Sequence, residues 1–158
     1  MGLRFSNLIQ ILFLLSVLST GCDQRRVYDS YQSPGKDGWS VDSLVTFSFG
    51  IQNSTRNHDI YVNVRNDKNY EYSNLWLFIR IIPPRGEVLT DTLQMVLADP
   101  SGRWLGKGFT GVFHNSMPYR TGVFFPVPGE YKVEIKHGMR PQLLKGLTHV
   151  GLRVEEAR

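Results

Sequence analysis

Cysteine is almost absent from this chain of 158 residues, in which Cys22 is the only one. A single thiol has no partner for an intrachain disulfide, and it leaves no Cys-x-x-Cys pair for zinc or redox chemistry. The Gly-x-Ser-x-Gly motif and the phosphate-binding Gly-x-x-x-x-Gly-Lys-Ser/Thr motif are missing as well. These absences argue against the common nucleophilic hydrolases and against P-loop enzymes.

Histidines and carboxylates are present, but their spacing predicts no site. No two histidines are separated by three residues, as a helical zinc pair would require, so no metal and no cofactor are expected. A glycosidase-like pair of acids would have to be assembled entirely by the fold. We therefore expect no enzymatic activity. The residues concerned are His58, His114, His137 and His149, and Glu87, Asp91 and Asp99.

The chain also lacks a segment in which charges of one sign are concentrated. The chain has 18 basic and 14 acidic residues, a formal charge of +4, and Arg25-Arg26 is the only short basic run near the N-terminus. Nucleic-acid binding normally needs a basic patch or stripe, which is not visible here. We expect neither a nucleic-acid partner nor a small-molecule ligand.

The N-terminus has the layout of a secretory signal. Residues 1–7 carry one cation, Arg4, and residues 8–18 are apolar apart from two polar positions. As a helix this apolar run would rise about 16 Å, half of the roughly 30 Å hydrocarbon core, so it is too short for a permanent span. The following Ser-Thr-Gly-Cys resembles a bacterial lipobox. We predict that residues 1–21 are a lipoprotein signal peptide and that Cys22 receives lipid, which ties the chain to a membrane.

Two other interpretations of this segment remain open. An ordinary signal peptide would leave Cys22 as an unpaired thiol in an oxidising compartment, which lipidation avoids. The Gly2 and Ser6 positions also match an N-myristoylation pattern, but that modification requires a cytosolic protein.

Residues 22–42 are polar and rich in turn formers, such as Pro34-Gly35 and Asp37-Gly38. We predict a lipidated N-terminal tether that sets the domain off from the bilayer. The alternative is that the aromatic residues Tyr28, Tyr31 and Trp39 pack back onto the domain as its first irregular layer.

Residues 43–158 are expected to form one β-sandwich domain. Apolar residues alternate with polar ones, which indicates strands with one buried face. Proline and glycine separate the segments, and no helical stripe is visible. The fold class predicted is all-β, an antiparallel β-sandwich that is immunoglobulin-like, with a jelly roll as the alternative. The expected strands are 45–51, 60–64, 75–82, 89–97, 123–125, 131–135 and 150–154.

The segment 91–108 contains the most distinctive candidate for binding. Asp99 can accept hydrogen bonds from backbone amides two residues on, and Gly102 can adopt positive φ, so the turn should be rigid. It presents Arg103, Trp104 and Lys107, and arginine and tryptophan are frequent anchors of protein interfaces. The alternative is that Trp104 and its neighbour Leu105 plug the end of the sandwich.

A second loop is expected at 114–121, with Tyr119 and Arg120 as further candidates for partner docking. The segment Gly129-Glu130-Tyr131 resembles the turn-plus-aromatic corner of sandwich domains and is interpreted as structural. A carbohydrate-binding lipoprotein is the alternative function, in which exposed aromatic rings serve as sugar platforms. The candidates for that role are Trp39, Trp76 and Trp104.

Several segments together resemble the GldH gliding-motility lipoproteins of Bacteroidota. The specific block is Leu97–Gly108 (LADPSGRWLGKG), and shorter matches cover almost the whole chain after Cys22. They are Cys22-Asp23 with Arg26-Val27-Tyr28, then YVNVRN (61–66), YSNL (72–75), DTL (91–93), PGEY (128–131), GMR (138–140) and VGLR (150–153).

This resemblance implies a non-enzymatic envelope lipoprotein, a structural or assembly component of the gliding-motility machinery and its linked protein-secretion apparatus. Its expected partners are other envelope proteins of these systems, and no catalytic residue is carried over. The sequence after Cys22, Asp-Gln-Arg-Arg, lacks the acid-rich run that directs lipoproteins to the cell surface in this phylum. We therefore expect an outer-membrane position that faces the periplasm.

Overall fold

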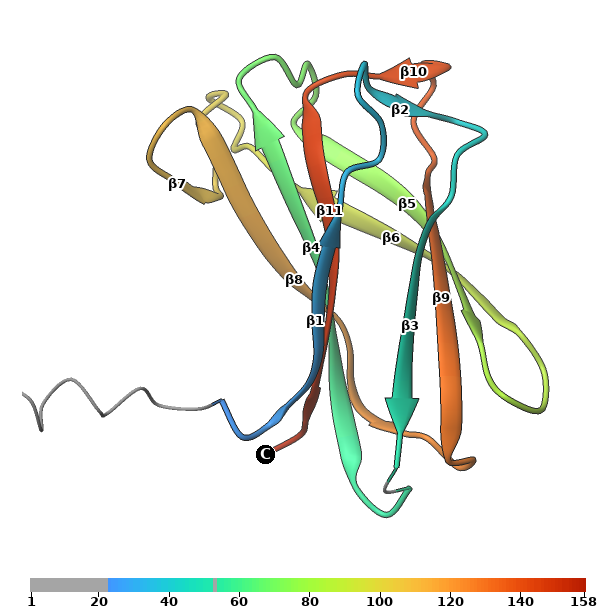
Figure 1. Ribbon diagram of the computed structural model, residues 1–158. Helices are drawn as coiled ribbons and strands as arrows, with labels where there is room; N and C mark the ends of the chain where they lie inside the picture. The colour runs from blue at the N-terminus through green and yellow to red at the C-terminus, as the bar shows by residue number, and fades with distance from the viewer. Residues whose placement is uncertain (1–22, 53) are drawn as a thin grey trace, which may run out of the picture.

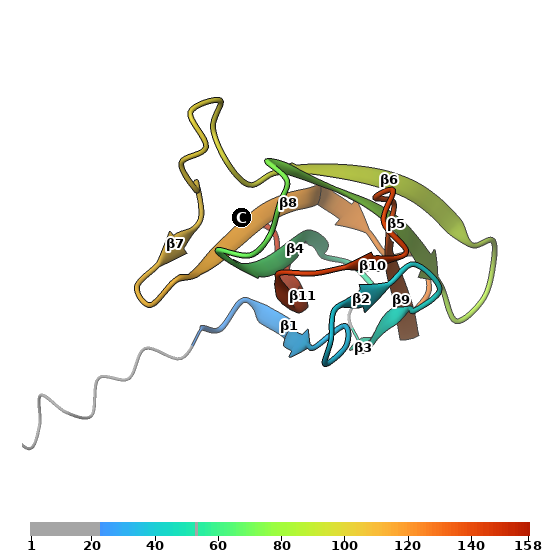
Figure 2. The same ribbon diagram turned by 90° about the horizontal axis from the view of Figure 1, so that it is seen from above.

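The computed structural model describes residues 23–52 and 54–158, so the predicted signal peptide and Cys22 lie outside the described residues. Every regular element in this part of the chain is a β-strand, and all strand pairs are antiparallel. Two sheets pack face to face as two layers (Figures 1 and 2). The prediction of an all-β antiparallel sandwich is confirmed.

The larger sheet joins the two ends of the described chain. Its strand order is β1-β11-β4-β8-β7. The first strand therefore pairs with the last, and the last strand, β11, lies between β1 and the long central strand β4. The bounds are β1 Arg26–Gln32, β11 Leu147–Glu156, β4 Asn57–Asp67, β8 Val112–Phe124 and β7 Lys107–Gly108.

The smaller sheet has the strand order β3-β9-β5-β6, and a ladder of two short strands, β10-β2, closes one end of the sandwich. Strands β5 and β6 form a hairpin whose turn contains Pro83-Pro84. The bounds are β3 Val45–Ile51, β9 Gly129–His137, β5 Asn74–Ile82, β6 Leu89–Val96, β10 Leu143–Leu144 and β2 Trp39–Ser40.

The core lies between the two sheets and follows the alternation in the sequence. In β5 the burial alternates residue by residue, with Leu75, Leu77 and Ile79 fully buried and the residues between them more exposed. Strands β3, β4, β9 and β11 contribute the same inward rows of branched and aromatic side chains. Burial of this apolar surface is the main term that holds the layers together.

The predicted tether does not match the structure. Residues 26–32 form β1, which pairs with β11 from Arg26 opposite Glu155 to Gln32 opposite Val150. The ring of Tyr28 packs on Phe47 and Phe49, with centroids 6.4 and 5.8 Å apart. The polar composition has a physical reason, because β1 is an edge strand that buries only part of one face.

Trp39 also belongs to the folded domain, as the alternative interpretation had it. Its side chain is fully buried, its indole N–H donates to the carbonyl of Ser43 over 3.1 Å, and its ring lies 5.5 Å from that of His137. The chain is therefore tied into the sandwich well before residue 43.

The predicted loop at 114–121 is wrong, because these residues lie within β8. Two residues interrupt the strand pattern in the sequence. Asn115 occupies an inward position and donates to the side chain of Asn66 over 2.9 Å, which satisfies a buried polar pair. Pro118 interrupts the pattern but is tolerated, because β7 covers β8 only at Phe113 and His114 and leaves the rest of this edge unpaired.

The corner predicted at Tyr131 is confirmed. Gly129 adopts a positive φ of 140°, and the hydroxyl of the buried Tyr131 donates to the carbonyl of Val127 over 2.8 Å. This bond fixes the turn between β8 and β9.

Replacing Ile79 by Ala tests which face of β5 forms the core. We expect the free energy of unfolding to fall by about 2–5 kcal/mol, because a cavity opens between the sheets. The matched control is Phe78→Ala on the outer face of the same strand, where the ring is 41% exposed. Urea unfolding should show less than half of the Ile79→Ala effect for this control, and equal losses would contradict the assigned register.

Candidate partner-docking surface

The turn at 99–103 is held by one carboxylate. Oδ1 of Asp99 accepts from the amides of Ser101 and Arg103, at 2.9 and 3.0 Å, and from the Ser101 hydroxyl at 2.6 Å. Oδ2 accepts from Nε of Arg103 at 3.0 Å. Gly102 has a φ of 82°, as the sequence predicts. The bond from the Ser101 hydroxyl is the main reason that the pKa of Asp99 lies below its usual range.

Trp104 lies where this turn meets the sandwich. Its indole stacks on Phe113 with centroids 5.5 Å apart, and it contacts Tyr70 at 6.4 Å. A bridge between Trp104 and Ala98 closes the loop. Trp104 is thus half-buried against the core, as the end-plug alternative expects, whereas the neighbouring Leu105 is 52% exposed.

The side chains around Trp104 point into solvent. The Arg103 side chain is 80% exposed, Lys107 is exposed, and Phe109, at the tip between β7 and β8, is fully exposed. Figure 2 shows β7 and the chain before it standing off from the two layers. We call Arg103, Leu105, Lys107 and Phe109 the docking surface.

Sequence reasoning missed Phe109. Its signal was present in the sequence, because a large aromatic flanked by Gly108 and by Thr110-Gly111 has no alternation that would bury it. A fully exposed Phe in a short turn is the kind of apolar side chain that an interface covers.

Tyr119 and Arg120 lie elsewhere. Both contact Asp91 of β6 in the opposite sheet, through the Tyr119 hydroxyl at 3.2 Å and the Arg120 guanidinium at 2.6 Å from Oδ2. Arg120 lies six residues beyond His114, the partner of Lys107 in the ladder, which is about 20 Å along the strand. These two residues clamp the sheets together at an open edge, and their part in docking stays a prediction.

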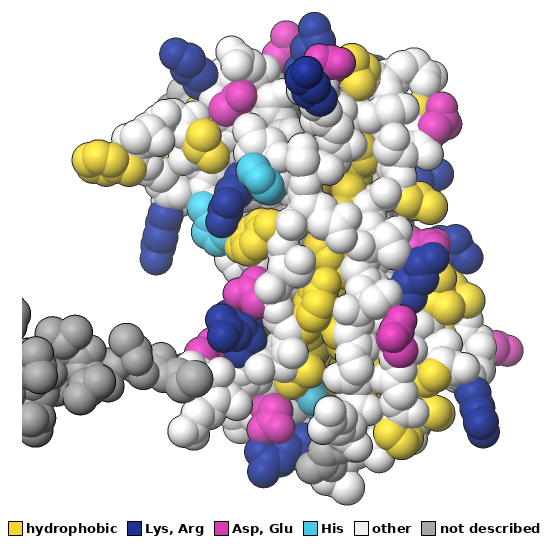
Figure 3. Space-filling view, in the orientation of Figure 1, with side chains coloured by type: hydrophobic (Ala, Val, Ile, Leu, Met, Phe, Trp, Pro, Cys, Tyr) yellow, Lys and Arg dark blue, Asp and Glu magenta, His cyan; other side chains and the backbone are white. Residues whose placement is uncertain are grey.

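The outer face of the larger sheet carries a second cluster of side chains, Tyr31, Arg65 and His114, which the sequence analysis did not predict. The guanidinium of Arg65 lies 4.3 Å from the centre of the Tyr31 ring, and His114 lies 5.9 Å from that ring. Burial and then the charge of Arg65 lower the pKa of His114. In Figure 3, histidines and cations gather on the upper part of the visible face, next to β7.

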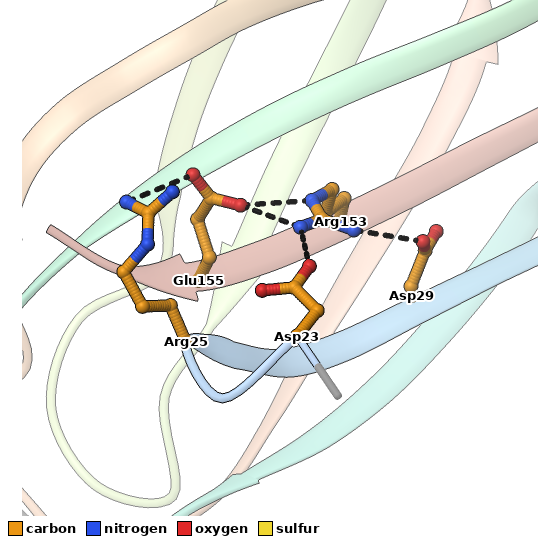
Figure 4. Close-up of polar contacts among 5 residues, drawn as sticks. All are labelled: Asp23, Arg25, Asp29, Arg153 and Glu155. Atoms are coloured by element: carbon orange, nitrogen blue, oxygen red, sulfur yellow. Dashed lines mark hydrogen bonds and ion pairs between the residues drawn. The ribbon is translucent and has the colours of Figure 1, made fainter. Parts of the chain in front are cut away.

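The N-terminal end of the described chain is fixed by ion pairs on Arg153 (Figure 4). This guanidinium binds Asp23, Asp29 at 3.1 Å and Glu155 at 2.7 Å, and Arg25 reaches Glu155 at 3.6 Å. The main chain adds two bonds, from the Arg26 amide to the Asp23 carbonyl at 3.2 Å and from the Glu156 amide to the Arg25 carbonyl at 2.8 Å. The chain is thus attached to the sheet from Asp23 onward.

Residues 23–52 and 54–158 contain neither a candidate metal cluster nor a candidate membrane-spanning helix. No cluster of three or more His, Cys, Asp or Glu side chains in this range could hold a metal ion. Nor does this range contain a helix long and apolar enough to cross a membrane.

Comparison with known proteins gives one family. Residues 26–154 match the family model described as GldH lipoprotein. A gliding motility lipoprotein GldH homolog from Christiangramia forsetii is 38% identical over 162 aligned positions, which cover 98% of this chain and 99% of that protein. Gliding motility lipoprotein GldH from Flavobacterium johnsoniae is 38% identical over 153 positions, which cover 92% of this chain and 94% of that protein.

Solved structures give only distant similarity. A family GH115 4-O-methyl-α-glucuronidase aligns with 87% of this chain at 14% identity and a TM-score of 0.45, over 18% of its own length. The VP2 subviral particle of infectious bursal disease virus aligns with 89% of this chain at 14% identity and a TM-score of 0.39, over 36% of its own length. Both TM-scores are too low to assign this chain a role from either structure.

Acid titration tests the clamp between the sheets. The Thr92 amide and then Arg120 hold the pKa of Asp91 below its usual 3.8, so its contribution to stability is present above about pH 4 and is lost as the pH falls through the lower folded-state value. We expect Asp91→Asn to cost about 1 kcal/mol or less at pH 7, because both partners are more than a third exposed and water screens the pair. The unfolding curves of variant and native protein should converge once the pH lies below the folded-state pKa of Asp91, and a constant difference would contradict the clamp.

Proposed function

The chain belongs to the GldH lipoprotein family, and from that premise we propose that it is a non-enzymatic structural or assembly component of the gliding-motility machinery and its linked secretion apparatus. Membership implies a lipid-anchored protein of the cell envelope. The finer proposal is that lipid on Cys22 holds it in the outer membrane, facing the periplasm, and that the domain docks on other envelope proteins of these systems.

The observation that carries the docking proposal is the exposure of Phe109 and Leu105 beside Arg103 and Lys107. Aromatic residues and arginine are enriched at protein interfaces, so Phe109 and Arg103 are the members of this surface most suited to anchor a partner. The Asp99 turn supports the same proposal, because a loop already fixed in one shape loses little conformational freedom when a partner binds.

The carboxylates considered for hydrolysis support a non-enzymatic role. Asp99 is engaged by its own turn, and Asp91 is engaged by Tyr119 and Arg120. Asp91 lies within β6 and Asp99 in the loop after it, and the side chains that contact them are different.

Carbohydrate binding is the second candidate. Trp39 cannot serve as a sugar platform because it is fully buried. Trp76 and Phe78 favour this candidate, because they are exposed two residues apart on the outer face of β5. A shift of tryptophan fluorescence on addition of envelope polysaccharide, lost in Trp76→Ala, would support it.

The docking proposal predicts that Phe109→Ser combined with Lys107→Glu prevents partner capture. We expect at least a 30-fold loss of affinity, since an interface anchor contributes about 2 kcal/mol or more. The measurement is affinity capture of the tagged, membrane-anchored protein from crosslinked cells, with motility and secretion proteins identified by mass spectrometry. Cell spreading over a surface should fail in parallel.

The control is Leu143→Ser, which removes a 42% exposed apolar side chain from β10, away from the docking surface. Trp104→Ala is a poorer test, because loss of its stacking on Phe113 would also destabilise the fold. Unchanged capture and spreading by the double variant, at normal abundance, would count against docking through this surface.

A further inference from the structure

The attachment of Asp23 to the sheet decides how the domain meets its membrane. Cys22 is bonded directly to Asp23, and consecutive Cα atoms are about 3.8 Å apart. Asp23 itself is bound by Arg153, and its carbonyl accepts from the amide of Arg26. Lipid on Cys22 would therefore begin one residue from the folded body, with no tether between the domain and the bilayer.

The strand register shows which parts of the domain share that end. Strand β1 begins there and β11 ends there, and β4 begins opposite the end of β8, with Asn57 paired to Phe124. In the other layer β3 ends opposite the start of β9, and the turn between β5 and β6 follows Ile82, which pairs with Lys132. Figure 1 shows these termini and turns together at the lower end of the sandwich. We call this the anchor end.

Apolar side chains are exposed at the anchor end. Phe124 is 56% exposed, and Val88 and Leu89 are each 43% exposed. A groove of about 680 Å³ lies beside them, with Pro83, Phe125 and Val127 among its lining residues. Figure 3 shows that apolar side chains also reach the surface at the lower right of the molecule.

Cations accompany these apolar side chains. Arg26 and Arg85 are exposed and form no salt bridge within residues 23–52 and 54–158. Arg56 is also at this end and pairs with Glu156. Exposed aromatic and aliphatic groups flanked by arginine suit the interface of a bilayer, where apolar groups enter the acyl boundary and cations meet lipid phosphates.

We propose that the anchor end is a membrane-contact surface. Phe124 and Val88 enter the interfacial region of the bilayer, Arg26 and Arg85 lie against lipid phosphates, and the Arg153 ion pairs fix the orientation of the domain. The docking surface then points away from the membrane, since ten residues of β8 between His114 and Phe124 span about 33 Å. This inference rests on the proposed lipidation of Cys22.

The test uses the full lipidated protein, reconstituted into vesicles of phosphatidylethanolamine and phosphatidylglycerol. A lipidated Cys22 has no free thiol, so Phe124→Cys and Leu143→Cys can each carry one environment-sensitive NBD label. Leu143 is the control because it is 42% exposed and lies in the β10-β2 ladder at the opposite end. We expect a blue-shifted emission and at least fivefold slower dithionite quenching at position 124 only.

Equal emission and equal quenching at the two positions would overturn the membrane-contact surface. The mass of the N-terminal peptide separates this result from failure of the proposed anchoring. A peptide that carries lipid leaves the proposed function standing when the contact is absent, whereas a peptide without lipid would overturn the anchor itself.

Arg153→Gln tests the orienting role of the ion pairs. We expect this variant to remain on the vesicles but to lose most of the difference in quenching between positions 124 and 143. Arg80→Gln is the matched control, because it removes an arginine–glutamate pair from the outer face of the smaller sheet. An undiminished difference in folded Arg153→Gln protein would show that the ion pairs do not set the orientation.

Discussion

The pairing of β1 with β11 is the constraint on which the rest of the structure depends. It brings the N-terminal segment onto the last strand, so that both ends of the described chain lie at one end of the sandwich. Arg153 reinforces the ladder by binding acids before, within and opposite β1. Because the ladder starts so near Cys22, the proposed site of lipid attachment lies directly next to the folded domain. A lipoprotein with a long flexible tether could take any orientation, whereas this geometry allows few.

The two ends of the sandwich expose different sets of side chains, and each set suits a different partner. At the anchor end, Phe124 and Val88 are exposed, and Arg26 and Arg85 form no salt bridge within the described part of the chain, which suits lipid. At the other end, the Asp99 turn presents Phe109, Leu105 and two cations on a loop that stands off from the layers, which suits a protein. Under these two proposals, the sandwich between the ends would serve as a rigid spacer, since its buried residues form one core cluster. A membrane-contact surface at one end and a docking surface at the other are consistent with a component that holds other envelope proteins at a set distance from a bilayer.

The sequence correctly predicted the features that depend on residues close together in the chain. Alternation identified β3, β5, β9 and β11, and the Asp99 turn and the Tyr131 corner followed from hydrogen bonds within a few residues. The failures have non-local causes. Strand β1 looks like a tether because its pairing partner lies at least 118 residues away, as in the pair of Gln32 with Val150, and its edge position requires little apolar surface. Tyr119 and Arg120 look like loop residues, but their role is set by Asp91 in the other sheet.

Hydrogen exchange of the backbone amides of residues 26–32 tests the central claim most directly. If β1 is part of the sandwich, the amides of this strand that donate to β11 will exchange orders of magnitude more slowly than those of the exposed turn at 109–111, and close to the rate for β4. The comparison is made on the mature protein, because residues 1–21 are predicted to be removed. Exchange at the rate of an unstructured peptide would contradict the account, since the domain would then hang on a tether and its orientation at the membrane would be free.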